Sequence, residues 1–161
     1  MRVSIFAIGR MKDGPERGLV SRYLERAQAG GKALGLSGFA VSEYPESRKG
    51  SAAARKTEEA RLLFDNLPEK SVLIALDERG KGLDSEAFAQ KIGAWREEGR
   101  AALSLVIGGA DGLDPHLRQR ADLILSFSPM TWPHQIVRIM AAEQLYRATT
   151  ILSGHPYHRG D

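Results

Sequence analysis

A short turn that joins an apolar stretch to an amphipathic helix contains residues able to hold a small ligand. The segment FSPMTW, from Phe127 to Trp132, follows the apolar stretch ADLILS and precedes Pro133. Its aromatic and thioether side chains offer apolar surface, and its two hydroxyl groups can form hydrogen bonds. This combination suits a ligand with a flat ring and a few polar groups, so we predict that the turn contributes to a binding site.

The helix predicted after Pro133 carries groups that could act on such a ligand. His134 and Arg138 are four residues apart and therefore share one face of the helix. His134 could exchange a proton near neutral pH, and a structural histidine at the edge of the core is the alternative. Arg138 has no carboxylate four residues away, so we predict that it is unpaired and contacts a phosphate or carboxylate of the substrate. Glu143 and Arg147 stand in the order that favours an ion pair within a helix.

The C-terminal segment SGHPYHRGD combines aromatic and basic side chains, namely His155, Tyr157, His158 and Arg159. Stacking together with positive charge is typical of RNA-binding segments. A solvated tail is the alternative, because chain ends often fray. We expect no metal, since no carboxylate or thiolate stands at ligand spacing from these histidines.

Composition restricts the class of protein. The 161 residues, 42% hydrophobic and 27% charged, fit a single globular domain spanning 1–161. A net charge of +3 permits a nucleic-acid partner without requiring one. The absence of cysteine excludes disulfides, thiolate nucleophiles and Cys-based zinc sites. The first apolar stretch is too short for a signal peptide or a membrane span, so we expect a cytoplasmic protein without membrane association.

Apolar strands alternate with helical segments along the chain. We predict strands over 3–8, 39–45, 71–76, 102–107 and 121–126. The later strands are almost continuously apolar, which is typical of strands buried on both faces. The sequence therefore predicts an α/β fold with a mostly parallel sheet and helices on both faces. Thr131 is the predicted cap of the last helix, with Pro133 in its first turn.

Three of the predicted strands end in loops that could share one pocket. Ligands of open α/β sheets bind beyond the carboxyl ends of the strands, and the loops after Leu76, at 108–112 and at 127–132 all lie there. None is a phosphate-binding motif, because the glycines at 80–82 lack P-loop spacing and IGGADG does not match GxGxxG. A tight turn without any ligand is the alternative for the two adjacent glycines at 108–109.

Three motifs, in this order and spacing, resemble the RlmH (YbeA-like) family: LVIGGADGL, LSFSPMTWPHQIVRIMAAEQLYRA and GHPYHR. These SPOUT-class RNA methyltransferases modify N3 of a pseudouridine in bacterial 23S rRNA. The resemblance also includes VSIFAIGRMKD and LIALDERGK, and so extends over the whole chain. Trp132 is a mild departure, because relatives often carry Phe or Leu at this apolar position.

The resemblance implies a fold, a methyl donor and partners. The C-terminal part would form a SPOUT-type α/β trefoil knot, in which the chain is threaded through a loop. The knot would bind S-adenosylmethionine through the residues that match the family motif, namely Leu76, Gly108, Phe127, Ser128, Pro129, Met130, Thr131 and Trp132. The chain would act as a homodimer on 23S rRNA in the assembled ribosome, with each pocket completed near the surface of the partner.

The acceptor of such a reaction is an imide nitrogen, which must lose or share its proton before it can attack. His158, His134 and Arg138 are the candidate catalytic residues, with the histidines as possible general bases. Arg138, Tyr157, His158 and Arg159 are the candidate contacts to the RNA substrate. Two alternatives stay open: a ribosome-associated RNA-binding module that has lost the donor site, and an enzyme that acts on a small nucleotide.

Overall fold

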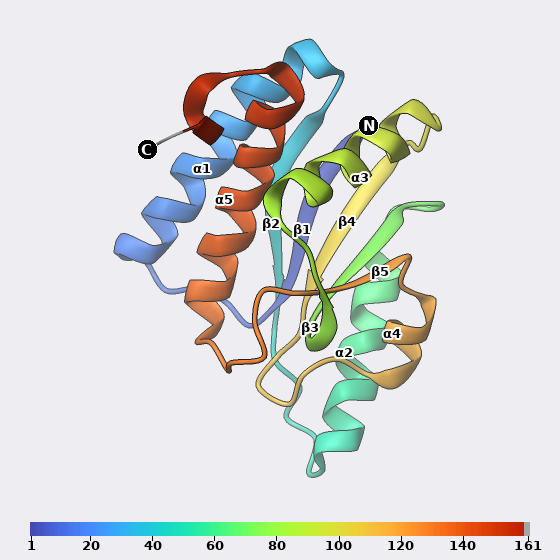
Figure 1. Ribbon diagram of the computed structural model, residues 1–161. Helices are drawn as coiled ribbons and strands as arrows, with labels where there is room; N and C mark the ends of the chain where they lie inside the picture. Colours follow the sequence, from blue (N-terminus) through green and yellow to red (C-terminus); the bar gives the residue numbers. More distant parts are fainter. Residues whose placement is uncertain (160–161) are drawn as a thin grey trace.

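The computed structural model describes residues 1–159, except for the side chain of Arg159, and contains one five-stranded sheet (Figure 1). The strands are β1 (Arg2–Ile8), β2 (Ser37–Tyr44), β3 (Val72–Gly82), β4 (Ala102–Ile107) and β5 (Leu123–Ser126). Their order across the sheet is β2-β1-β4-β3-β5, and each of these pairs is parallel. The predicted parallel α/β sheet is confirmed.

Helices cover both faces of the sheet, as predicted. They are α1 (Pro15–Gly31), α2 (Ala52–Asn66), α3 (Ser85–Glu97), α4 (Pro115–Arg120) and α5 (His134–Ser153), together with the short 3-10 helices η1 (Lys32–Leu34) and η2 (Pro156–Arg159). Successive strand residues point to opposite faces, so Ile5 packs in the core under α1, α3 and α5, whereas Phe6 packs under α2 and α4. In the part of the chain that the structure describes, no helix has both the length and the apolar character needed to cross a bilayer.

Strand β3 extends six residues beyond its predicted end at Leu76. Leu76 and Lys81 both stand opposite Leu125 of β5, so the intervening residues leave the ladder and the strand then rejoins it. Gly80 permits this return, because a methyl group there would lie 2.7 Å from the carbonyl oxygen of Ile124. The apolar pattern stops at Leu76, which is why the sequence did not reveal the second half of the strand.

The start of α5 differs from the prediction. Thr131 does not cap the helix; the capping position is Pro133, which offers no side-chain hydrogen bond. The carbonyl oxygen of Pro133 accepts the first helical hydrogen bond, from Val137 N at 3.1 Å. Proline lacks an N–H group, so the extended backbone at Pro133 leaves no donor unpaired there. Thr131 lies in the turn that precedes this cap.

The prediction that Arg138 is unpaired is wrong. Its side chain is buried, and Nη1 donates to Oε1 of Glu43 at 2.7 Å. Nη2 donates to the carbonyl oxygens of Ile8 at 2.9 Å and Gly9 at 2.6 Å. Burial lowers the pKa of Arg138, while the charge of Glu43 opposes that change. The partner lies on β2, 95 residues away, so spacing within the helix could not reveal the pair.

The ion pair between Arg138 and Glu43 should be a large contribution to stability. Arg138→Ala removes one of the two arginines that pair with Glu43, the other being Arg17, and it leaves the carbonyl oxygens of Ile8 and Gly9 without this donor. Breaking a buried pair typically costs about 3–5 kcal/mol. Arg61→Ala is the matched control, because the pair with Asp65 is exposed and worth about 0.5 kcal/mol or less. Urea unfolding measures both values.

The double variant Arg138→Ala/Glu43→Gln separates the ion pair from the packing of the arginine side chain. A neutral glutamine can still accept the hydrogen bond from Met11 N, but it also removes the ion pair of Glu43 with Arg17. If the lost charge pair dominates the cost of Arg138→Ala, the double variant should be about as stable as Glu43→Gln alone. A double variant clearly less stable than Glu43→Gln would show that the packing and the backbone hydrogen bonds of Arg138 dominate.

Candidate functional site

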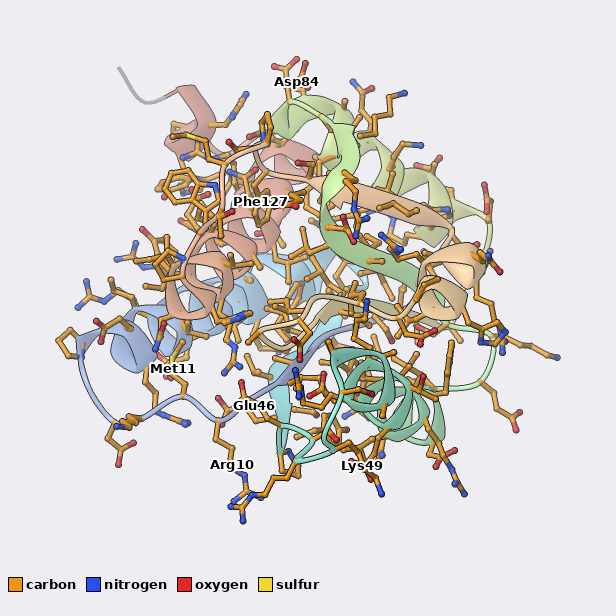
Figure 2. All side chains as sticks on the ribbon, turned by 90° about the horizontal axis from the view of Figure 1, so that it is seen from below. Arg10, Met11, Glu46, Lys49, Asp84 and Phe127 are labelled. Atoms are coloured by element: carbon orange, nitrogen blue, oxygen red, sulfur yellow. The ribbon has the colours of Figure 1, made fainter. Side chains whose placement is uncertain are left out.

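The three predicted loops meet at the carboxyl edge of the sheet, around a cavity of about 390 Å³. Figure 2 views the molecule from this edge. Seven of the eight residues predicted to hold the donor line the cavity: Leu76, Gly108, Phe127, Ser128, Met130, Thr131 and Trp132. Pro129 belongs to the same turn but is not among the lining residues, whereas His134 is. The structure therefore brings these segments together, and their role in binding stays a prediction.

One wall of the cavity is a tight backbone turn at 108–112. Gly112 N donates to Gly109 O at 3.0 Å, and Gly112 has a φ of +81°, a region that favours glycine. A methyl group on Gly108 would lie 2.9 Å from the carbonyl carbon of Gly112. The glycines therefore form the tight turn that the sequence allowed, and the same turn is a wall of the cavity.

Large apolar side chains remain exposed beside the cavity. Met130 is 68% exposed, Trp132 39% and Ile136 36%, although such side chains are usually covered. They lie together at the turn before α5 and in the first turn of that helix. An apolar group here is typical of a surface that a ligand or another chain covers.

Carboxylates predominate among the charged residues of the lining. Asp77, Glu78 and Asp111 line the cavity together with one guanidinium, that of Arg79, while Arg118 and Arg55 pair with Asp77 and Asp111 from outside the lining. Burial raises the pKa of Asp77, but hydrogen bonds from Arg79 and the charges of Arg79 and Arg118 outweigh it, so the net shift is downward. An ionised lining of this sign disfavours a phosphate group and suits a ligand with positive charge.

Arg55 of α2 holds the loop at 108–112 in place. Its Nε donates to Oδ2 of Asp111 at 2.6 Å, and its Nη2 donates to Oδ1 at 3.1 Å. These hydrogen bonds lower the pKa of Asp111. Arg55 also donates through Nη1 to the carbonyl oxygen of Lys49 at 3.0 Å. The sequence analysis missed this residue, because no motif distinguishes one arginine of a charged helix from another.

A second side chain of α2, Glu59, is buried behind the same loop. It accepts a hydrogen bond from Ser47 N at 2.9 Å, and a methyl group on Gly109 would lie 3.1 Å from its Oε2. Burial raises the pKa of Glu59, the hydrogen bond from Ser47 opposes the shift, and the charge of Asp111 adds to it. The carboxylate thus joins two loops at the cavity edge at some cost in desolvation.

The C-terminal residues lie away from the cavity in this chain. The hydroxyl of Tyr157 donates to Glu143 at 3.2 Å, and Nε2 of His158 lies 3.3 Å from Glu86. Glu143 is nine residues along α5 from His134, which corresponds to about 14 Å of helix rise. Neither Tyr157 nor His158 lines the cavity.

The environment of Tyr157 keeps its hydroxyl protonated. Burial and the nearby charge of Glu143 raise its pKa to about 12. Its ring also packs against Tyr146 at 4.6 Å between centroids. The predicted ion pair in α5 is confirmed, because Arg147 Nε donates to Glu143 at 2.9 Å. The side chain of Arg159, predicted to contact substrate, falls outside the described residues.

A family model described as "Predicted SPOUT methyltransferase" matches residues 1–158. This chain belongs to the SPOUT methyltransferase family. It is 59% identical over 159 residues to a protein of Rhizobium etli (strain ATCC 51251) named "Ribosomal RNA large subunit methyltransferase H", with 99% of each chain covered. A protein of the same name from Brucella anthropi is also 59% identical, over 99% of each chain. The resemblance read from the motifs is confirmed at the level of the family.

A solved structure described as a probable methylase family protein from Haemophilus influenzae Rd KW20 is similar in outline. It aligns with a TM-score of 0.49 and 14% identity, covering 97% of this chain and 69% of that chain. A likeness this weak supports no conclusion about function. The trefoil knot is implied by membership of the SPOUT family, and the threading itself stays a prediction.

The cavity fits S-adenosylmethionine, the methyl donor of SPOUT methyltransferases. Trp132 and Met130 offer apolar surface for an adenine ring, and the loop at 108–112 presents backbone groups rather than side chains. The carboxylates of Asp77 and Asp111 suit the positive charge of a sulfonium. In the part of the chain that the structure describes, no group of three or more His, Asp or Glu side chains could hold a metal ion.

Substituting Gly108→Ala should weaken donor binding, because the methyl group cannot fit without moving the loop. Overpacking of this kind costs about 1–3 kcal/mol. If that cost falls on binding, the dissociation constant for S-adenosylmethionine rises about tenfold or more. Gly82→Ala is the matched control, since no atom lies within 4 Å of its added methyl group. Calorimetric titration of both variants decides the matter, and equal affinities would contradict the role of Gly108.

The raised pKa of Glu59 should appear in the pH dependence of stability. Between its ordinary value of 4.5 and the higher value in the fold, the native state holds a proton that the unfolded state has lost. The stability contributed by Glu59 is therefore present at low pH and is lost as the pH rises through the folded pKa. Glu59→Gln should abolish that loss, and the exposed Glu69→Gln should retain it. Urea unfolding from pH 4 upward measures the free energy of unfolding at each pH. Parallel curves of this free energy against pH for wild type and Glu59→Gln would contradict the raised pKa of Glu59.

Proposed function

We propose that this chain transfers a methyl group from S-adenosylmethionine to the large-subunit ribosomal RNA, at N3 of a pseudouridine in 23S rRNA on the assembled ribosome. The observation that carries the proposal is the match over 99% of the chain to proteins named for methylation of this RNA. The lining of the cavity supports it, because apolar surface and carboxylates suit an adenosyl sulfonium better than a phosphate.

The residues of the chain would supply orientation and proton transfer. When bound, S-adenosylmethionine supplies an activated methyl group, so catalysis is mostly positioning. His134 lines the cavity at the start of α5 and is one candidate to accept the imide proton. His158 is the other. Tyr157 stays protonated at neutral pH and would donate a hydrogen bond to the RNA rather than act as a base.

A homodimer would bring the C-terminal residues to the cavity. In one chain, α5 begins beside the cavity and ends after 20 residues, about 30 Å further along, before η2 carries Tyr157 and His158. A catalytic group must come within hydrogen-bonding distance of the acceptor. We infer that each cavity receives the η2 segment of a second copy, which would also cover the exposed Met130, Trp132 and Ile136.

Other properties follow from this proposal. The chain would act as one domain over 1–161, because its cavity is built by strands from both halves of the sequence. Its substrate implies a cytoplasmic location, where ribosomes are assembled and used. Contact with a membrane is no part of the proposed activity.

A methylation assay tests the proposal directly. Ribosomes with and without the pseudouridine are incubated with the protein and radiolabelled S-adenosylmethionine. Label should be incorporated only into the ribosomes that contain the pseudouridine. Calorimetry with S-adenosylmethionine supplies the control for the alternative function. An RNA-binding module without a donor site would bind ribosomes and release no heat with the donor.

Replacing His158→Ala should slow methyl transfer and leave donor binding intact, since His158 does not line the cavity of its own chain. Loss of a general base typically slows a reaction by about 10²–10⁴-fold. An unchanged rate would remove His158 from the mechanism.

Mixing two impaired variants, at a donor concentration well below the dissociation constant of Gly108→Ala, tests whether the site is shared between chains. In a mixed dimer of His158→Ala with Gly108→Ala, one cavity has an intact glycine loop and receives His158 from the other chain. Random reassortment makes half the dimers mixed, with one working site each, so about a quarter of wild-type activity should return. A mixture with no activity would place His158 in its own chain's site.

A further inference from the structure

Two loops border the cavity without lining it. The segment 9–14 follows β1, and the segment 45–51 follows β2. They lie against each other, because Gly9 N donates to Tyr44 O at 2.7 Å and a methyl group on Gly9 would lie 3.5 Å from Oε1 of Glu46. Figure 2 shows Arg10 and Lys49 on the same border of this edge, with Glu46 close to Arg10.

This border carries a group of exposed positive charges. Arg10, Lys12 and Arg48 are exposed and form no ion pair with any other residue that the structure describes. Lys49 is exposed as well, and its Nζ lies 3.9 Å from Glu58, which is a weak contact in solvent. We name these four residues the basic border. It contrasts with the carboxylates that line the cavity beside it.

The half of the basic border that lies on the loop at 45–51, Arg48 and Lys49, is attached to the wall of the cavity through α2. Arg55 binds Asp111 with two hydrogen bonds and also donates to the carbonyl oxygen of Lys49. Glu59 accepts from Ser47 N and packs against Gly109. A buried carboxylate and a bidentate arginine therefore fix the loop at 45–51 to the loop at 108–112. A loop that only met solvent would need no such attachment.

We propose that the basic border, Arg10, Lys12, Arg48 and Lys49, binds the phosphate backbone of the ribosomal RNA next to the target base. Arg55 is then the positioning residue that holds the border at a set place beside the donor. The inference rests on the proposed function and adds the surface that the RNA contacts. Phosphate contacts set the register of a nucleic acid on a protein, while the base is read elsewhere. Four cations on adjacent loops provide such contacts.

The inference also accounts for the small net charge of the chain. An overall +3 gives little attraction for a polyanion, but attraction depends on how charges are arranged on a surface. Here four exposed cations, three of them without an ion pair among the described residues, lie on adjacent loops beside the cavity, together with two exposed carboxylates, Asp13 and Glu46. An RNA backbone that followed this border would present its splayed base to the cavity without meeting the carboxylates inside.

The double variant Arg48→Ala/Lys49→Ala tests the contact. Each phosphate that the protein no longer neutralises reduces the slope of log affinity against log salt by about 0.7–0.9. We therefore expect weaker binding to purified bacterial ribosomes, about tenfold near 0.1 M salt, with a slope smaller by about 1.5 and a raised KM for ribosomes. The affinity for S-adenosylmethionine should stay within twofold of wild type.

The matched control removes two positive charges elsewhere. Arg61 lies on α2 beyond Arg55, and Lys70 precedes β3 at the opposite edge of the sheet; both are exposed. Arg61→Ala/Lys70→Ala should retain the wild-type slope. If the two double variants show the same affinity and slope, the basic border is not the RNA contact. Wild-type protein that binds ribosomes but does not methylate them would instead overturn the proposed function and leave the border testable by its salt slope.

A second variant distinguishes two possible roles of Arg55, namely positioning the basic border and contacting the RNA directly. Arg55→Ala keeps all four basic side chains but releases the loop that carries Arg48 and Lys49 from Asp111. We expect weaker ribosome binding with an unchanged salt slope, because the same cations still reach phosphates but are no longer held in register. Arg55→Lys should restore little of the ribosome affinity, since lysine cannot form the bidentate pair with Asp111. A salt slope reduced as in Arg48→Ala/Lys49→Ala would make Arg55 a direct contact, and wild-type affinity would remove its positioning role.

Discussion

The close approach of two backbones, at the end of β3 and in β5, is the constraint on which the site depends. Gly80 lies where a methyl group would come within 2.7 Å of Ile124 O, so only glycine lets β3 rejoin the ladder at Lys81. The residues that leave the ladder form the overhang that brings Asp77 to the cavity. Gly108 imposes a similar constraint on the opposite wall. Both walls of the cavity therefore depend on glycine, because a side chain at either position would displace the backbone.

Charge is separated over the carboxyl edge of the sheet. Inside the cavity, hydrogen bonds from Arg79 of the same strand lower the pKa of Asp77, and hydrogen bonds from Arg55 of α2 lower the pKa of Asp111. Outside, the basic border stays unpaired toward solvent, with only the weak contact of Lys49 to Glu58. A sulfonium donor and a polyanionic RNA need opposite surroundings, and this arrangement offers both within one small edge. If the basic border contacts RNA as proposed, this separation would let a chain with little net charge bind both ligands.

Helix α5 links the cavity to the rest of the molecule. Its first turns carry His134 into the cavity, and the buried Arg138 joins the helix to β1 and β2 through Ile8, Gly9 and Glu43. Its far end leads to η2 and directs Tyr157 away from the cavity of its own chain. In the homodimer proposed above, the η2 segment of one chain would lie at the cavity of the other.

The sequence by itself determined the parallel α/β fold, the three loops that meet at one edge and, through the family motifs, seven of the residues that line the cavity. Those features depend on local apolar patterns and on motifs that are contiguous in the chain. Only the tertiary structure revealed the second half of β3, the burial of Arg138 and the contacts that Arg55 and Glu59 make with Asp111 and Ser47. Each of these depends on a partner far away in the sequence. Spacing along one helix carries no information about such a partner, because folding alone decides which distant side chains meet.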